Sequence, residues 1–80
     1  MKIGVKVMPK NEVLDTQGRA VEQTLKHHQS PVDQCRVGKY VQLDISESDE
    51  HKALSKAKEI AEFVLYNPLI ETYELEVIKR

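Results

Sequence analysis

The sequence has little of what a secreted, metal-bound or membrane protein needs. Its 80 residues contain one cysteine, Cys35, so no internal disulfide and no thiolate metal cage can form. No apolar run approaches the ~20 residues that cross a bilayer. Residues 1–7 alternate apolar side chains with lysine or glycine, whereas a signal peptide has a continuous apolar block. We therefore expect a cytoplasmic protein with no membrane contact.

An excess of charge of one sign is also missing. Twelve Lys and Arg residues stand against 13 Asp and Glu residues, which gives a formal net charge of −1. Nucleic-acid modules usually show a basic excess, because phosphate neutralisation supplies most of their affinity. RNA-binding sheets also stack bases on aromatic side chains, and only Tyr40 and Tyr73 are candidates here. We expect no nucleic-acid partner.

Residues that form recognised catalytic or ligand sites are few as well. The phosphate-loop patterns GxxxxGK[ST] and GxGxxG do not occur. His27 and His28 are adjacent and would point about 100° apart on a helix, which suits no shared metal ion. Cys35 falls on the apolar side of an extended segment and is most simply a small buried hydrophobe. We expect no catalytic residue and no metal site in this chain.

The length fits one domain over residues 1–80. Residues 1–7 alternate as a half-buried strand does, and Pro9 ends this strand. Asp15 is the predicted N-cap of a helix that ends before Ser30-Pro31. Gly18 in its first turn suggests close backbone approach. The helix carries an apolar stripe of Ala20, Val21, Thr24, Leu25 and His28.

The second half of the chain repeats this alternation of extended and helical segments. Residues 34–45 are extended, and a helix begins at Ser46 or Ser48. Asn67-Pro68 stops the helix, with Asn67 suited to a left-handed C-cap, and a last strand covers residues 73–77. The apolar face of the helix comprises Ala53, Leu54, Ala57, Ile60, Ala61, Val64 and Leu65.

Within residues 34–45, Lys39 interrupts the apolar row. Gly38-Lys39 is either the two-residue turn of a hairpin or a bulge in one long strand that turns Lys39 away from the core. The element order is β-α-β(β)-α-β, the α+β class. We predict a ferredoxin-like sandwich with two helices packed on one face of a mainly antiparallel sheet. The other face then meets water or another subunit.

Three short segments combine into a family resemblance. They are Leu14-Asp15 with Gln17-Gly18 and Ala20-Val21; Val32 with Arg36-Val37-Gly38-Lys39; and Asn67-Pro68, Ile70-Glu71 and Tyr73. In this order and spacing the chain resembles the PurS family, the small subunit of phosphoribosylformylglycinamidine synthase. It departs from the family pattern in having Thr16 where proline is usual, Cys35 where an aliphatic residue is usual, and no glycine after the first helix.

The resemblance implies a non-catalytic subunit of a purine-biosynthesis complex. Such a subunit joins an ATP-dependent synthetase subunit to a glutaminase subunit and supports ammonia transfer between them. It is a homodimer or a dimer of dimers and binds no cofactor itself, while the complex uses ATP with Mg and glutamine. The alternative is a small ferredoxin-like regulatory module that binds a ligand, because this fold alone does not decide function.

The same resemblance marks residues for partner contact. Arg36 and Lys39 are expected to be charged contacts, with Gly38 allowing close approach. The other two segments supply the remaining expected partner-binding residues, which are Leu14, Asp15, Gln17, Gly18, Asn67, Pro68, Ile70 and Glu71.

Overall fold

The computed structural model describes residues 1–78 and has three strands in one antiparallel sheet. The central strand β1 pairs with β2 on one side and β3 on the other. The order is β-α-β-α-β, which is the predicted β-α-β(β)-α-β order with a single strand between the two helices. The elements are β1 (Lys2–Pro9), α1 (Thr16–His27), β2 (Lys39–Asp44), α2 (Glu50–Ile60), the π-helical turn η1 (Ala61–Leu65) and β3 (Glu71–Ile78).

The core lies between β1 and the helix formed by α2 and η1. Every second residue of β1 (Ile3, Val5 and Val7) is at most 1% exposed, as period-2 alternation requires. Facing them are three fully buried alanines spaced four residues apart: Ala53, Ala57 and Ala61. Alanine at these positions lets the helix backbone approach the sheet closely.

Both ends of the second helix differ from the prediction. The N-cap is Asp49 rather than Ser46 or Ser48, and its carboxylate accepts the His51 N–H at 2.9 Å. At the other end α2 widens into η1, and Tyr66 returns to extended backbone. Asn67 has no left-handed backbone. Its side-chain oxygen instead accepts the Leu69 N–H at 3.0 Å and starts a turn.

Gly38-Lys39 forms neither a hairpin turn nor a bulge. A single strand begins at Lys39, which pairs opposite Val7, and residues 34–38 lead into it without strand pairing. The register puts Lys39 on the core side of the sheet, where it stays exposed at the strand end. A Cβ at Gly38 would overlap the Val7 carbonyl and the Met8 sulfur, so glycine lets the chain pass β1 closely.

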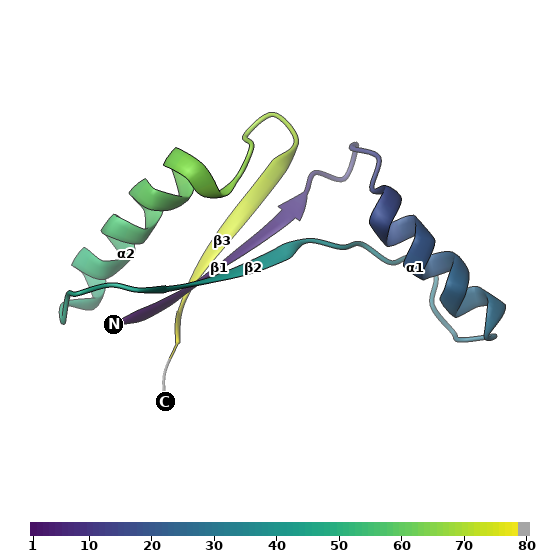
Figure 1. The fold of residues 1–80 in the computed structure, drawn as a ribbon, viewed down its shortest axis with the longest axis horizontal. Coiled ribbons are helices and arrows are strands. Elements are labelled where there is room, and N and C mark those ends of the chain that lie inside the picture. Colours follow the sequence, from purple (N-terminus) through teal and green to yellow (C-terminus); the bar gives the residue numbers. More distant parts are fainter. Residues whose placement is uncertain (79–80) are drawn as a thin grey trace.

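α1 lies apart from the sheet. It extends beyond the ends of the strands, while α2 alone covers the sheet face (Figure 1). The radius of gyration is 15.6 Å, against about 12 Å for a compact chain of this length. The prediction that both helices cover one face is met by α2 only. The stripe on α1 remains largely open, with Ala20, Val21 and Thr24 exposed.

The sheet face opposite α2 is polar. Tyr40 donates its hydroxyl proton to Glu76 at 2.5 Å, and the Lys6 ammonium lies 3.0 Å from the same carboxylate. These two partners lower the pKa of Glu76. The Tyr40 ring covers Gly4, where a Cβ would overlap it. No helix of residues 1–78 is long and apolar enough to span a bilayer.

Candidate partner-binding surface

The three predicted segments meet at one end of the sheet. β1 ends there, and β2 and β3 begin there (Figure 1). The Lys10 N–H donates to the Ile70 carbonyl at 2.8 Å, and the Val37 N–H donates to Asp15 at 2.8 Å. We call this surface the junction and define it as residues 10–18, 35–39 and 67–71. Segments with residues as far apart in sequence as Lys10 and Ile70 thus form one surface.

Asp15 links the first two segments through both carboxylate oxygens. One oxygen accepts the Gly18 N–H at 2.9 Å, which is the predicted N-cap bond. The other accepts the Val37 N–H. These two donors, with a smaller contribution from the charge of Arg36, hold the pKa of Asp15 below its ordinary value. The carboxylate is therefore ionised and acts only as an acceptor.

The predicted close approach of another backbone segment to Gly18 is confirmed. Gly18 is buried, and a Cβ there would lie 2.6 Å from the Cys35 carbonyl oxygen. Next to this contact the Cys35 N–H donates to Glu22 at 2.8 Å, which lowers the pKa of Glu22. The chain that returns from α1 therefore runs directly against the first turns of the helix.

The two basic candidates have different surroundings. Arg36 is half-buried, and its guanidinium donates to the Pro9 carbonyl within the same chain. Lys39 is exposed. Lys39 is therefore better placed than Arg36 to contact a partner's carboxylate. Arg36 instead stabilises the junction through its hydrogen bond to Pro9.

An open hollow of about 500 Å³ brings most of the predicted residues together. Seven of them line it: Leu14, Asp15, Gln17, Gly38, Lys39, Ile70 and Glu71. A second hollow of about 590 Å³ shares Val13, Leu14 and Asp15 with the first and includes Arg36. Leu14 belongs to the wall of both hollows and is 65% exposed. Gly18, Asn67 and Pro68 line neither hollow.

The turn after η1 presents apolar side chains beside the hollow. Leu69 is 81% exposed and Ile70 is 43% exposed. Asn67 shapes this turn, because its backbone N–H donates to Glu71 at 2.7 Å and its carbonyl accepts from Ile70 and Glu71. Asn67 therefore positions contact residues. Leu69 was not among the predicted contact residues, although its position outside every periodic segment was a usable signal.

Two further exposed apolar residues were missed on η1. Phe63 is 85% exposed and Val64 is 62% exposed. Val64 was expected on the buried face from its helical spacing. Because the π turn has more residues per turn than an α-helix, Val64 does not lie on the same helix face as Ala53, Ala57 and Ala61.

The residues considered for chemistry do not come together. His27, His28 and His51 are exposed, and Cys35 is a half-buried free thiol. Among the residues that the structure describes, no group of three or more His, Cys, Asp or Glu side chains could hold a metal ion. The junction instead offers exposed apolar side chains, an exposed lysine and a hydrogen-bonded backbone, which suit contact with another protein.

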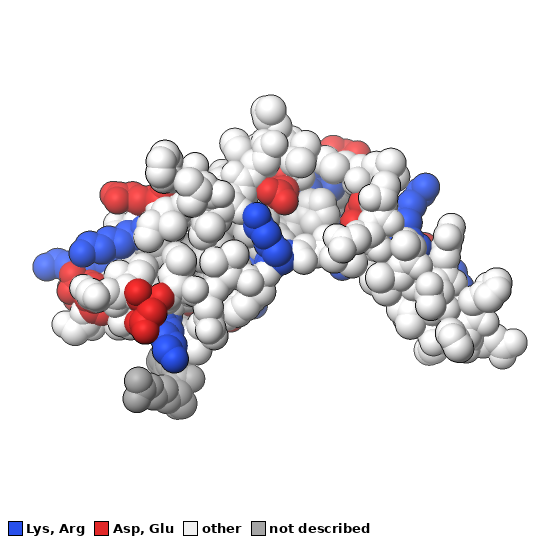
Figure 2. All heavy atoms as spheres, in the orientation of Figure 1, with Lys and Arg blue, Asp and Glu red and all other residues white. Residues whose placement is uncertain are grey.

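Figure 2 shows how charge is distributed over one side of the molecule. Acidic and basic side chains mix over α2 and the centre of the molecule, while much of the α1 side is uncharged. A surface with mixed charge steers and orients a partner more than it sets affinity, whereas buried apolar anchors set affinity. Leu14 and Leu69 are the exposed leucines available for that purpose at the junction.

Comparison with known proteins places the chain in a family. Residues 2–79 match the family model for PurS, phosphoribosylformylglycinamidine (FGAM) synthase. The FGAM synthase subunit PurS of Bacillus subtilis is 40% identical over 77 residues, covering 95% of this chain and 90% of that protein.

Solved structures of PurS subunits are also similar to this chain. The purS subunit from Thermotoga maritima superposes with a TM-score of 0.88 at 30% identity, covering 94% of this chain and 87% of that chain. A chain of the Thermotoga maritima PurLQS structure gives 0.86 at 30% identity, covering 94% and 93%. The chain belongs to the PurS family of FGAM synthase subunits.

Proposed function

We propose that this chain is the non-catalytic small subunit of FGAM synthase and joins the synthetase subunit to the glutaminase subunit. The observation that carries the proposal is the convergence of all three family segments on the junction. The solved PurLQS structure, which contains a chain similar to this one, supports the same reading. In this proposal the larger subunits bind ATP with Mg and glutamine, and the chain itself binds neither.

The junction suits a sealed contact. Ammonia released from glutamine has to reach the synthetase without escaping to water, so the subunits must meet without gaps. Leu14, Leu69 and Ile70 supply apolar area that a partner would cover, and Lys39 adds a charged contact at the rim. The backbone beneath them is held by Asp15 and Arg36, so little ordering is required on binding.

A homodimer, and beyond it a dimer of dimers, is the second part of the proposal. The chain is elongated, at 47 × 31 × 13 Å, because α1 has no sheet beneath it. Its stripe of Ala20, Val21 and Leu25 has the period of a core-facing helix. A second copy could cover this stripe and offer its own α1 in return, which is the self-complementary arrangement of a two-fold dimer.

The complex is tested by titrating this chain into fixed synthetase and glutaminase subunits and measuring glutamine-dependent amidine formation. Lys39→Ala and Leu14→Ser should raise the concentration required for half-maximal activity at least several-fold. Both side chains are exposed, so the folded subunit should keep its stability. Arg36→Ala is a poorer test because Arg36 also braces Pro9.

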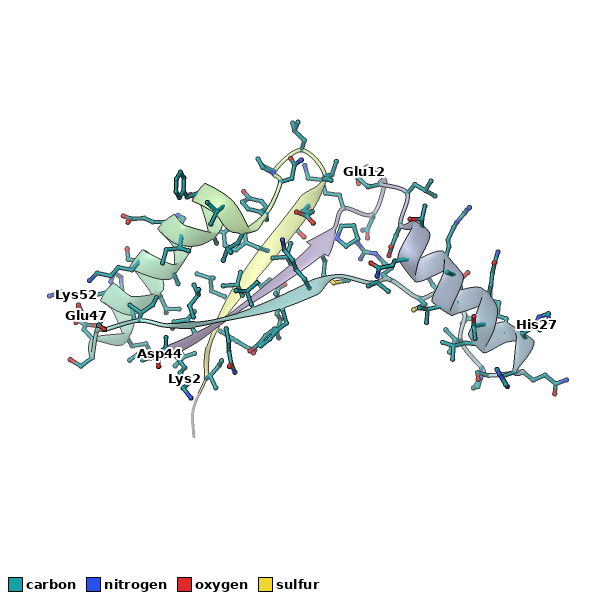
Figure 3. The ribbon with its side chains drawn as sticks, viewed as in Figure 1. Lys2, Glu12, His27, Asp44, Glu47 and Lys52 are labelled. Carbon is teal, nitrogen blue, oxygen red and sulfur yellow. The ribbon has the colours of Figure 1, made fainter. Side chains whose placement is uncertain are left out.

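Lys52→Ala is the matched control. Lys52 lies on α2, at the end of the molecule opposite His27, and is well separated from Glu12 in the junction (Figure 3). It removes the same charge outside the proposed surface, and activity should not change. Full activity of both junction variants at limiting subunit concentration would rule out the junction as the contact.

The dimer is tested by sedimentation of a variant that charges the α1 stripe. Val21→Asp should dissociate the dimer, because Val21 is 42% exposed in the single chain and its burial is expected only between copies. Gln23→Asp changes an exposed residue of the same helix outside the stripe and should leave the dimer intact. A Val21→Asp protein that still sediments as a dimer would show that another surface joins the copies.

A further inference from the structure

We infer that Asp15 is the positioning residue that fixes the direction of α1 relative to the sheet. Two chain segments connect the sheet with the arm, which we define as residues 15–37. One runs outward through residues 10–14, and the other returns through Gly38 to β2. The Asp15 carboxylate stands at the start of the arm and holds the Val37 N–H, at its end, at 2.8 Å.

Val37 lies next to the residue that packs on the sheet, so its bond with Asp15 also affects how α1 is placed relative to the sheet. Gly38, the next residue, passes so close to Val7 and Met8 that a Cβ would not fit. β2 begins at Lys39 and pairs with β1. The backbone therefore goes from its bond with Asp15 to contact with the sheet within one residue. With so short a connection, α1 cannot change its direction much relative to the sheet unless the bond between Asp15 and Val37 breaks.

Asp15 does both tasks because its carboxylate has two acceptor oxygens. One oxygen caps α1 through the Gly18 N–H, and the other crosses to Val37. Glu22 also holds the returning chain, but its bond to the Cys35 N–H lies further along α1. Glu22 thus aligns that chain with the helix. Asp15 links the helix to the segment that enters the sheet.

The test separates capping from positioning. Asp15→Asn keeps one side-chain oxygen for the Gly18 N–H, since asparagine caps as well as aspartate does. The asparagine NH2 group then faces the Val37 N–H. Because NH2 is a donor, it cannot accept the hydrogen bond from Val37. Asp15→Ser also keeps the cap and removes the second acceptor without adding a donor. Circular dichroism should show both variants folded.

The main readout is amide hydrogen exchange in the intact chain. Protection of the Val37 amide should fall by about tenfold or more, as loss of a hydrogen bond to a charged acceptor predicts. The Gly18 amide should keep its protection. Asp49→Asn is the matched control, because Asp49 caps its own helix α2 through the His51 N–H. It should leave Val37 unchanged.

A second readout concerns assembly and rests on the proposed function. Both Asp15 variants should require more subunit for half-maximal activity of the complex, and Asp49→Asn should not. Unchanged Val37 protection in both Asp15 variants, or equal loss in the Asp49 control, would overturn the inference. If the wild-type chain fails to support the complex, the proposed function fails, while the exchange result still decides the role of Asp15.

Discussion

Gln29 carries the one left-handed backbone among the non-glycine residues that the structure describes, with φ at 60°. It follows α1, where the Ser30 N–H donates to the Leu25 carbonyl at 3.0 Å and the Gln29 N–H donates to Lys26 at 2.9 Å. This pair of bonds is the Schellman ending, in which glycine is usual. The chain departs from the family pattern in having no glycine after this helix, yet the backbone still adopts the conformation that favours glycine.

Gln29→Gly should therefore stabilise the protein. Removing the Cβ from a left-handed residue relieves a cost that exceeds the extra entropy of glycine in the unfolded chain, with a net gain of about 0.5–1 kcal/mol. Urea unfolding measures this gain. Gln23→Gly, in the exposed middle of α1, should instead lose roughly 0.5–1 kcal/mol. A loss at both positions would show that Gln29 makes a contact worth more than its strain.

Tyr73 gives stability a dependence on alkaline pH. Burial, and then its hydrogen bond to Glu62 at 2.7 Å, raises the pKa of Tyr73 to about 12. Its hydroxyl ionises near 10 in an unfolded chain, so the folded state favours the neutral form. The resulting stability is complete below pH 10 and is lost as the pH rises from 10 towards 12.

Unfolding measured between pH 9 and pH 12 should show this loss in the wild-type protein. Tyr73→Phe cannot ionise and should flatten that part of the profile, although it also gives up the Glu62 bond. Absorbance of the phenolate gives an independent check, because one tyrosine should titrate near pH 12. Identical alkaline profiles for both proteins would contradict the assignment.

At the scale of elements, α2 depends on small residues. Ala53, Ala57 and Ala61 are fully buried against Ile3, Val5 and Val7. Helical periodicity predicted these positions as apolar. It did not distinguish them from Ile60 and Val64, which the structure leaves 37% and 62% exposed.

Ala57→Leu should destabilise the protein by roughly 1–3 kcal/mol, because a larger side chain would force the helix away from the sheet. Lys56→Leu places the same side chain on the exposed neighbouring position and should change the free energy of unfolding by less than about 0.5 kcal/mol. Chemical denaturation of both variants measures the difference. Equal stability of the two would mean that α2 does not pack closely on β1.

For the whole molecule, the elongated single chain predicts stability that depends on concentration. If α1 is covered by a second copy, unfolding is coupled to dissociation. Each tenfold increase in protein concentration should then add about 1.4 kcal/mol of apparent stability. Thermal melts over a hundredfold range of concentration measure this. A midpoint independent of concentration would mean that the single chain is stable by itself.

Local pattern predicted the elements well but their ends less well. The alternation in β1 and the cap at Asp15 needed only neighbouring residues, and both are confirmed. The start of α2 was misplaced because Ser46, Ser48 and Asp49 are all good caps, and only the bond to His51 selects among them. The π turn has no sequence signal that periodicity can detect, so Val64 was assigned to the wrong face.

The sequence by itself determined which residues are apolar and favour burial. It also determined the order of strands and helices and the three family segments. Tertiary structure decided where α1 lies and that the three segments meet. Periodicity reports that a helix face is apolar, but it does not say what will cover that face. The Asp15–Val37 bond spans 22 positions, and the Lys10–Ile70 bond spans 60. Contacts of that range depend on the path of the whole chain, which no local pattern contains.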